Sequence, residues 1–163
     1  MPTKSYKIFE NKKIHVPPLW SKNGASVTKA ITWDEKNTTI TSAKLRFTVD
    51  PNAGYVKAWV ELNYAEIARF IWALGDQAPK SEEFDIIGSL VNGNNFCKIV
   101  GAKEFGNFND VIFYMSVDIV LTYEGDDPVI KPDWQKYLEY AAIGIGTTAA
   151  VITIGGALTE EKK

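Results

Sequence analysis

The clearest pattern in the sequence is the strict alternation of apolar and polar residues in segments 43–49, 56–62 and 111–123. Successive side chains of a strand point to opposite faces of a sheet, so each segment predicts a half-buried strand. Shorter stretches at 27–33, 84–87 and 96–102 predict further strands. Segment 66–74 fits either a strand or a short helix, and we favour the strand. Because turn-forming residues separate these segments, we predict a mainly β fold, an antiparallel β-sandwich of the jelly-roll type.

The pattern divides the chain into three regions. Residues 1–24 are expected to form an extended basic arm, since Pro17-Pro18 prevents a helix there and 21–24 has turn chemistry. Residues 25–133 form the predicted sandwich domain. Residues 134–163 are expected to hold a C-terminal apolar helix and a short charged tail.

The C-terminal region contains an uncharged run of nineteen residues, 140–158. As a helix it would extend about 28 Å, close to the hydrocarbon thickness of a bilayer. We predict a single-pass membrane anchor, with a packing helix of a larger assembly as the alternative. The residues expected to form the anchor are Tyr140, Ile143, Ile145, Val151, Ile152, Ile154 and Leu158, and Ala142, Gly146 and Ala150 form a row of small residues for close helix packing.

The amino-acid composition limits the kinds of functional site that the chain can form. Among 163 residues, 45% are hydrophobic and 23% charged, with one His and one Cys. A disulfide framework or a Cys/His zinc site needs several such residues, so we predict no metal, no cofactor and no catalytic centre. Cys97, inside a predicted strand, is expected to be a buried, inert thiol.

The charge is unevenly distributed along the chain. Residues 1–30 carry six lysines against one glutamate, a net +5, whereas residues 31–139 carry ten basic and seventeen acidic side chains, a net −7. The arm is therefore expected either to be solvated or to contact a neighbouring subunit, anionic lipid or nucleic acid. With an overall charge of −2, nucleic acid is not expected as a partner except through this arm.

One tryptophan is placed away from the predicted core. The alternation puts Trp59 with Lys57 and Glu61, opposite the Val56/Val60 face. An exposed aromatic ring with polar neighbours can stack on a sugar or anchor a protein contact. The alternative is that Trp59 packs under the arm, under a loop or against a neighbouring copy.

Two carboxylate arrangements are weaker candidates. Asp118, Glu124, Asp126 and Asp127 offer oxygen ligands for calcium, without any EF-hand spacing. Glu61 with Asp118 would be a carboxylate pair for glycoside hydrolysis, again without a specific signature.

The middle of the chain resembles galactose-binding-like jelly-roll domains over residues 43–125. The matching segments are VKAWVELN at 56–63, FDIIGSLVNGNN at 84–95 and LTYEG at 121–125. The sequence departs from the family where Tyr64, rather than the usual glycine, follows Asn63. The resemblance implies a jelly-roll sandwich and permits carbohydrate binding, but no sugar-binding residue carries over.

The whole arrangement also looks like a small membrane-linked viral coat protein, with an arm, a jelly roll and a lipid anchor. Our first hypothesis is therefore a non-enzymatic assembly protein, a membrane-anchored subunit of a virion shell or surface assembly whose partners are the bilayer and other subunits. The alternative is a membrane-tethered carbohydrate-binding module. A hydrolase on one face of the sandwich ranks third.

Overall fold

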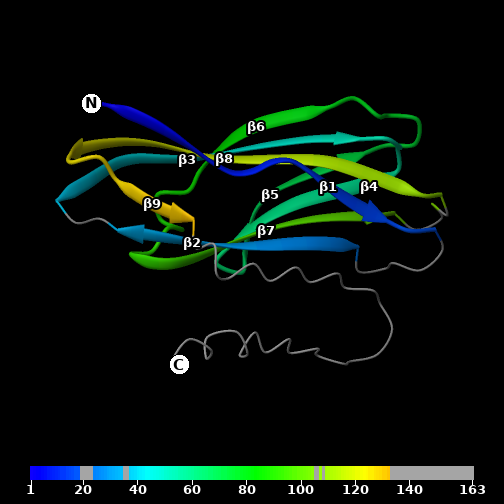
Figure 1. Cartoon of the computed structure of the whole chain (residues 1–163). Coiled ribbons are helices and arrows are strands. Elements are labelled where there is room, and N and C mark those ends of the chain that lie inside the picture. The colour runs from blue at the N-terminus through cyan, green and yellow to red at the C-terminus, as the bar shows by residue number, and fades with distance from the viewer. Residues whose placement is uncertain (19–23, 35–36, 105–106, 108, 133–163) are drawn as a thin grey trace, which may run out of the picture.

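The computed structural model describes residues 1–18, 24–34, 37–104, 107 and 109–132. In this part of the chain, strands form two antiparallel sheets that lie one above the other (Figure 1). Sheet A has the order β1-β8-β3-β6 and sheet B the order β5-β4-β7-β2-β9. The strands are β1 (Thr3–Val16), β2 (Ala25–Asp34), β3 (Thr38–Pro51), β4 (Val56–Leu62), β5 (Ala65–Trp72), β6 (Lys80–Asp85), β7 (Gly93–Lys103), β8 (Val111–Gly125) and β9 (Val129–Pro132).

The core lies between the two sheets and is built by the alternation seen in the sequence. In β4 and β8, every second side chain is buried and the intervening ones are more exposed. Phe47 of sheet A stacks on Phe70 of sheet B, with ring centroids 5.2 Å apart. Trp72 closes the same side of the core, and its indole nitrogen donates to the Ala78 carbonyl at 2.7 Å. The predicted β-sandwich is thus confirmed.

Most strand predictions are confirmed, and β2, β3, β7 and β8 are longer than predicted. The alternating segments 43–49, 56–62 and 111–123 lie in β3, β4 and β8, and 27–33 and 96–102 lie in β2 and β7. The ambiguous segment 66–74 is strand β5 as far as Trp72. Segment 84–87 only partly overlaps a strand, because β6 ends at Asp85 and Ile86 starts the following turn.

The N-terminal arm needs a correction. Residues 3–16 are extended, as expected, but they form strand β1 and pair with β8 along the edge of sheet A. The register shifts at two places between Lys7 and Lys12, and Ile8 and Phe9 are both buried although they are adjacent. Lys29 on β2 donates to the Ile8 carbonyl at 2.9 Å across the sandwich. The sandwich therefore begins at Thr3 rather than at residue 25.

The predicted membrane anchor lies outside the described residues. Among the residues that are described, no helix has the length and apolar character needed to cross a bilayer.

Candidate functional site

The three residues predicted as contacts share one face of the sandwich. Lys57, Trp59 and Glu61 alternate along β4 with its buried residues and are only partly exposed. They lie on the outer face of sheet B, where β5 and β7 flank β4 on its two sides. Whether they contact a ligand stays a prediction, but their surroundings are now defined.

Trp59 is enclosed by charged neighbours. Its indole nitrogen donates to Glu61 Oε1 at 2.8 Å. The guanidinium carbon of Arg69, the residue opposite on β5, lies 4.6 Å from the centroid of the indole ring. Arg69 is itself held by Glu66, with Nε donating to Oε1 at 2.9 Å, and this bond lowers the pKa of the Glu66 carboxyl. A cation over the ring occupies stacking surface, so Trp59 is less available to a ligand than its position suggests.

Glu61 and Lys57 also have ionic partners. Glu61 Oε2 accepts from Lys98 of β7 at 3.2 Å, and Lys57 Nζ lies 3.3 Å from Glu104 Oε1. These partly exposed pairs add little to stability, but they fix the directions of the polar groups around Trp59.

Beyond Glu61, the chain makes a tight turn that carries the most unusual backbone of this face. Asn63 and Tyr64 connect β4 to β5 as a two-residue loop, because Leu62 pairs directly with Ala65. Their φ angles are +52° and +69°. Two positive φ angles are the signature of a type I′ hairpin turn, which favours Asn followed by Gly. Tyrosine at the second position therefore costs free energy relative to glycine.

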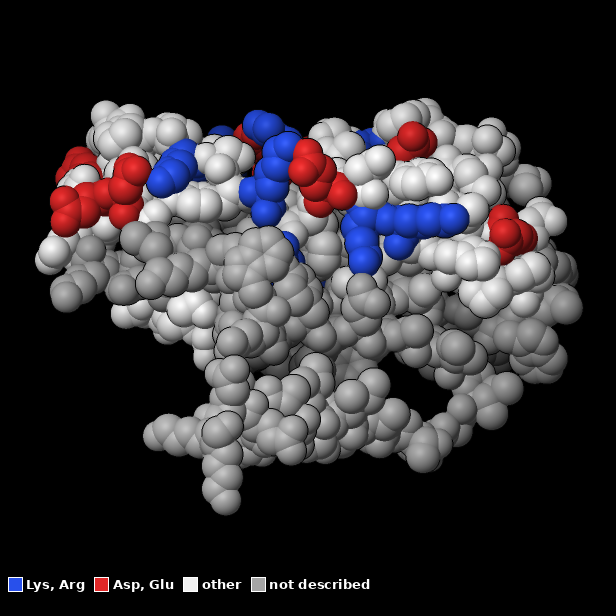
Figure 2. All heavy atoms as spheres, in the orientation of Figure 1, with Lys and Arg blue, Asp and Glu red and all other residues white. Residues whose placement is uncertain are grey.

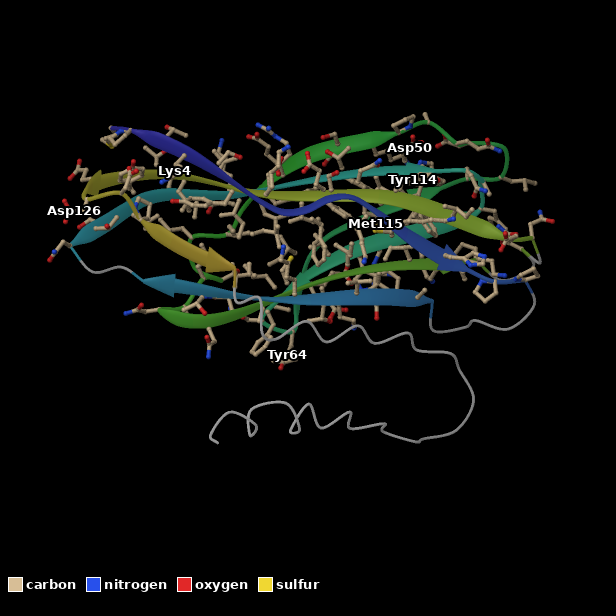
Figure 3. All side chains as sticks on the ribbon, viewed as in Figure 1. Lys4, Asp50, Tyr64, Tyr114, Met115 and Asp126 are labelled. Carbon is tan, nitrogen blue, oxygen red and sulfur yellow. The ribbon has the colours of Figure 1, made fainter. Side chains whose placement is uncertain are left out.

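The Tyr64 side chain projects away from sheet B into solvent (Figure 3). It is 83% exposed, and its ring lies 5.9 Å from that of Phe96 on β7 at a tilt of 35°. We call this aromatic pair, Tyr64 and Phe96, the turn platform. Asn94 and Lys98 flank Phe96 on the same face of β7, since they are two residues away in the strand.

Two asparagines hold the turn platform in place. The Asn63 side chain donates to Asn95 Oδ1 at 2.8 Å and to the Ser89 carbonyl at 2.9 Å, and it accepts from the Phe96 amide at 2.9 Å. Asn95 is fully buried, and it also exchanges hydrogen bonds with both backbone groups of Val91. This network joins the β4–β5 turn to the β6–β7 loop, so the platform rests on a rigid base.

Sequence reasoning did not identify the turn platform. It noted that Tyr64 replaces the expected glycine, but took this as a departure from a family pattern. The signal was present, because Asn followed by a bulky residue in a two-residue loop forces that residue into a conformation it disfavours. The role of Asn95 had no comparable signal, since its partners are distant in sequence.

The four carboxylates proposed for calcium are not assembled into one site. Asp118 lies opposite Arg46 within sheet A, Glu124 lies near the far end of β8 opposite Thr39, and Asp126 and Asp127 follow beyond that end. Asp127 is engaged by the Tyr123 hydroxyl and by Lys4 Nζ. In the part of the chain that is described, no three His, Cys, Asp or Glu side chains gather as a metal site would need.

The proposed hydrolytic pair is also separated. Glu61 is on the outer face of sheet B and Asp118 on the outer face of sheet A, so the whole core lies between them. Stacked sheets are about 10 Å apart before the outward side chains are added, which exceeds the spacing of a glycosidase pair. This particular prediction was wrong.

The side of the molecule along β1 has a different character. Figure 2 shows its Lys and Arg interspersed with Asp and Glu rather than gathered by sign. Lys4 pairs with Asp127, Lys7 with Glu10 and His15 with Asp110. The residues predicted for the membrane anchor and for its helix packing, between Tyr140 and Leu158, lie outside the described residues and are not placed.

Comparison with known proteins gave structural resemblances but no sequence relatives. No family model matches the chain, and no curated protein matches it. Among solved structures, the chain is similar to the CBM36-1 domain of a multidomain xylanase from the hindgut metagenome of Trinervitermes trinervoides, at 9% identity and a TM-score of 0.44, covering 77% of this chain and 99% of that one. It is also similar to an acetyl xylan esterase (Est2A) from the rumen bacterium Butyrivibrio proteoclasticus, at 10% identity and a TM-score of 0.32, covering 77% of this chain and 34% of that one.

Proposed function

We propose that the protein is a glycan-binding module that uses the outer face of sheet B, with the turn platform as its principal contact. The observation that carries this proposal is Tyr64, an 83% exposed aromatic residue in a left-handed backbone conformation, backed by Phe96. Strained residues cluster where a ligand is held, and an exposed rigid tyrosine offers a large contact area at little entropic cost.

The groups around the platform suit a sugar. A pyranose presents an apolar face to an aromatic ring and hydroxyl groups around its edge. Along β7, Asn94 and Lys98 lie on the two sides of Phe96, and Asn94 Oδ1 accepts from Thr32 Oγ1 at 3.2 Å. Ring and hydrogen-bonding groups therefore occupy one continuous surface, as in ligand sites where a few polar groups set orientation.

The test is affinity electrophoresis of the full-length protein through gels containing single polysaccharides. We expect retardation by at least one glycan and its loss in Tyr64→Ala. The matched control is Tyr114→Ala, which removes a 40% exposed tyrosine from the outer face of sheet A. Equal retardation of wild type and Tyr64→Ala, or no retardation by any glycan, would contradict the proposal.

A second function rests on the uncharged run at 140–158. We propose that this segment attaches the sandwich to a membrane as part of a larger assembly. Its nineteen residues match a bilayer in length, and small residues recur at Ala142, Gly146 and Ala150.

Flotation with liposomes tests this attachment. The full-length protein should float at both low and high salt, whereas a chain ending at residue 135 should stay at the bottom of the gradient. Flotation of neither chain would reject the anchor. Flotation of the truncated chain at low salt alone would assign lipid binding to the lysines of β1 instead.

A further inference from the structure

We propose that the ligand of this face is an uncharged glycan, which rests on the glycan-binding function proposed above. Charged side chains of both signs surround Trp59. The outward-facing charges of β4, β5 and β7, with Glu104 at the end of β7, amount to three bases against three acids, a net charge of zero: Lys57, Arg69 and Lys98 against Glu61, Glu66 and Glu104.

Each base is neutralised by its own acid. Lys57 Nζ lies 3.3 Å from Glu104, Lys98 Nζ lies 3.2 Å from Glu61, and Arg69 makes a two-point contact with Glu66. A sulfate or uronate group would have to displace one of these carboxylates and leave it unpaired beside the new anion. The face therefore offers no net attraction to an acidic polysaccharide.

The same ion pairs can bind hydroxyl groups. A carboxylate in one ion pair keeps lone pairs for further donors, and a lysine ammonium keeps further N–H groups. A pair of adjacent sugar hydroxyls can thus donate to Glu61 and accept from Lys98 while the ring rests on the turn platform. Asn94 and Thr32 on the other side of Phe96 add uncharged donors and acceptors.

The β1 edge provides a contrast within the same molecule. Thr3–Val16 carries four lysines against one glutamate, a net +3 with His15 neutral. Lys4 and Lys7 are paired with Asp127 and Glu10, so an acidic polysaccharide would be held at this edge only by exposed surface charge, and its binding should disappear with salt and should not depend on Tyr64. The two kinds of binding are separable by experiment.

The experiment measures binding of the full-length protein to two panels. The uncharged panel holds mannan, galactan, β-glucan and xylan, and the acidic panel holds polygalacturonate, alginate and chondroitin sulfate. We expect Tyr64-dependent binding to an uncharged glycan that persists in about 0.5 M NaCl, where screening removes most surface electrostatics. Any binding to the acidic polysaccharides should be abolished at that salt concentration. At low salt it should be the same in Tyr64→Ala as in the wild type.

Two variants test whether the ion pair between Glu61 and Lys98 sets the preference for uncharged glycans. Glu61→Gln keeps the side-chain shape but leaves Lys98 unpaired, so it should weaken uncharged glycan binding about tenfold and introduce acidic glycan binding. Glu83→Gln is the control, because it breaks an equivalent ion pair with Arg46 on the outer face of sheet A. Tyr64-dependent binding to acidic glycans alone would overturn this inference and leave glycan binding intact. Binding to neither panel would overturn both.

Discussion

At the scale of single residues, Tyr64 is the most informative position in the molecule. Its φ of +69° is a value that glycine adopts readily and tyrosine rarely adopts. Its ring is exposed and packs against the ring of Phe96. The left-handed conformation costs about 1–3 kcal/mol, and the contact between the rings returns about 0.5–1.5 kcal/mol. The folded state is therefore less stable than it would be with glycine, which is the expected signature of a residue kept for binding.

Tyr64→Gly should consequently raise the free energy of unfolding by about 1 kcal/mol while glycan binding is lost. Urea denaturation followed by tryptophan fluorescence measures the stability. Tyr114→Gly is the opposite control, because glycine in the middle of β8 should destabilise the protein by a similar amount. A Tyr64→Gly variant that is clearly less stable than wild type would show that no strain is stored there.

Cys97 leads to a prediction about pH. The thiol is completely buried between the sheets, and burial raises its pKa from 9.0 to about 12. The native state therefore holds this proton more tightly than the unfolded chain does. Below about pH 9 both states keep the proton, and the stability contribution is constant. Between pH 9 and 12 the unfolded chain releases it, so stability should fall with rising pH, by up to about 1.4 kcal/mol per pH unit.

The comparison is between wild type and Cys97→Ala. The alanine variant should be less stable at neutral pH because of its cavity, and the difference between the two proteins should shrink above pH 9. A thiol reagent at pH 8 should label Cys97 only after denaturation. Rapid labelling of the native protein would contradict the burial on which both expectations rest.

At the scale of elements, the β4–β5 turn and the β6–β7 loop are joined by Asn63 and Asn95. Asn95→Leu fills a similar volume but removes one of the three hydrogen bonds of the Asn63 side chain and the bonds from Asn95 to both backbone groups of Val91. Losing three part-buried hydrogen bonds at once should lower the free energy of unfolding by about 2 kcal/mol or more. Thermal unfolding checks this, with Asn92→Leu as the exposed control on the same loop. Equal stability of the two variants would show that the network does not hold the loop.

The outer edge of β1 leads to a prediction about association. This strand lies at the end of sheet A, and its exposed lysines and two register shifts disfavour pairing with another chain. Lys7→Val with Lys13→Val should therefore produce concentration-dependent self-association in analytical ultracentrifugation. Lys44→Val with Lys98→Val, on interior strands, should leave the association state of the protein unchanged. Monomers in both cases would mean that the lysines have no protective role.

The periodicity of apolar residues was sufficient to predict the strands that alternate regularly, but it was insufficient to predict β1 and β9. Strands β4 and β8, and β3 from Ala43 onward, alternate without interruption, because each places every second side chain in the core. In β1 the shift near Ile8 and Phe9 breaks the alternation, and β9 has only four residues, so neither was predicted. For the site, the alternation correctly put Trp59 on an outer face. It could not show that Arg69 covers the ring, because that contact depends on pairing with β5.

At the scale of the whole molecule, the two outer faces of the sandwich have different characters. Sheet A presents Tyr114 and ion pairs such as Arg46 with Glu83. Sheet B presents Trp59, the three neutral ion pairs and the turn platform at the end of the β4–β5 hairpin. We therefore propose that the ligand binds on the outer face of sheet B, mainly at the end that carries the turn platform.

The most direct test of this assignment is a ¹H–¹⁵N chemical-shift titration of the full-length protein with the glycan that retards it most. The amides of Asn63, Tyr64, Phe96 and Lys98 should shift together and saturate at one affinity, while those of Tyr114 and Ser116 on the outer face of sheet A stay in place. Shifts centred on sheet A, with the turn platform unchanged, would contradict the account.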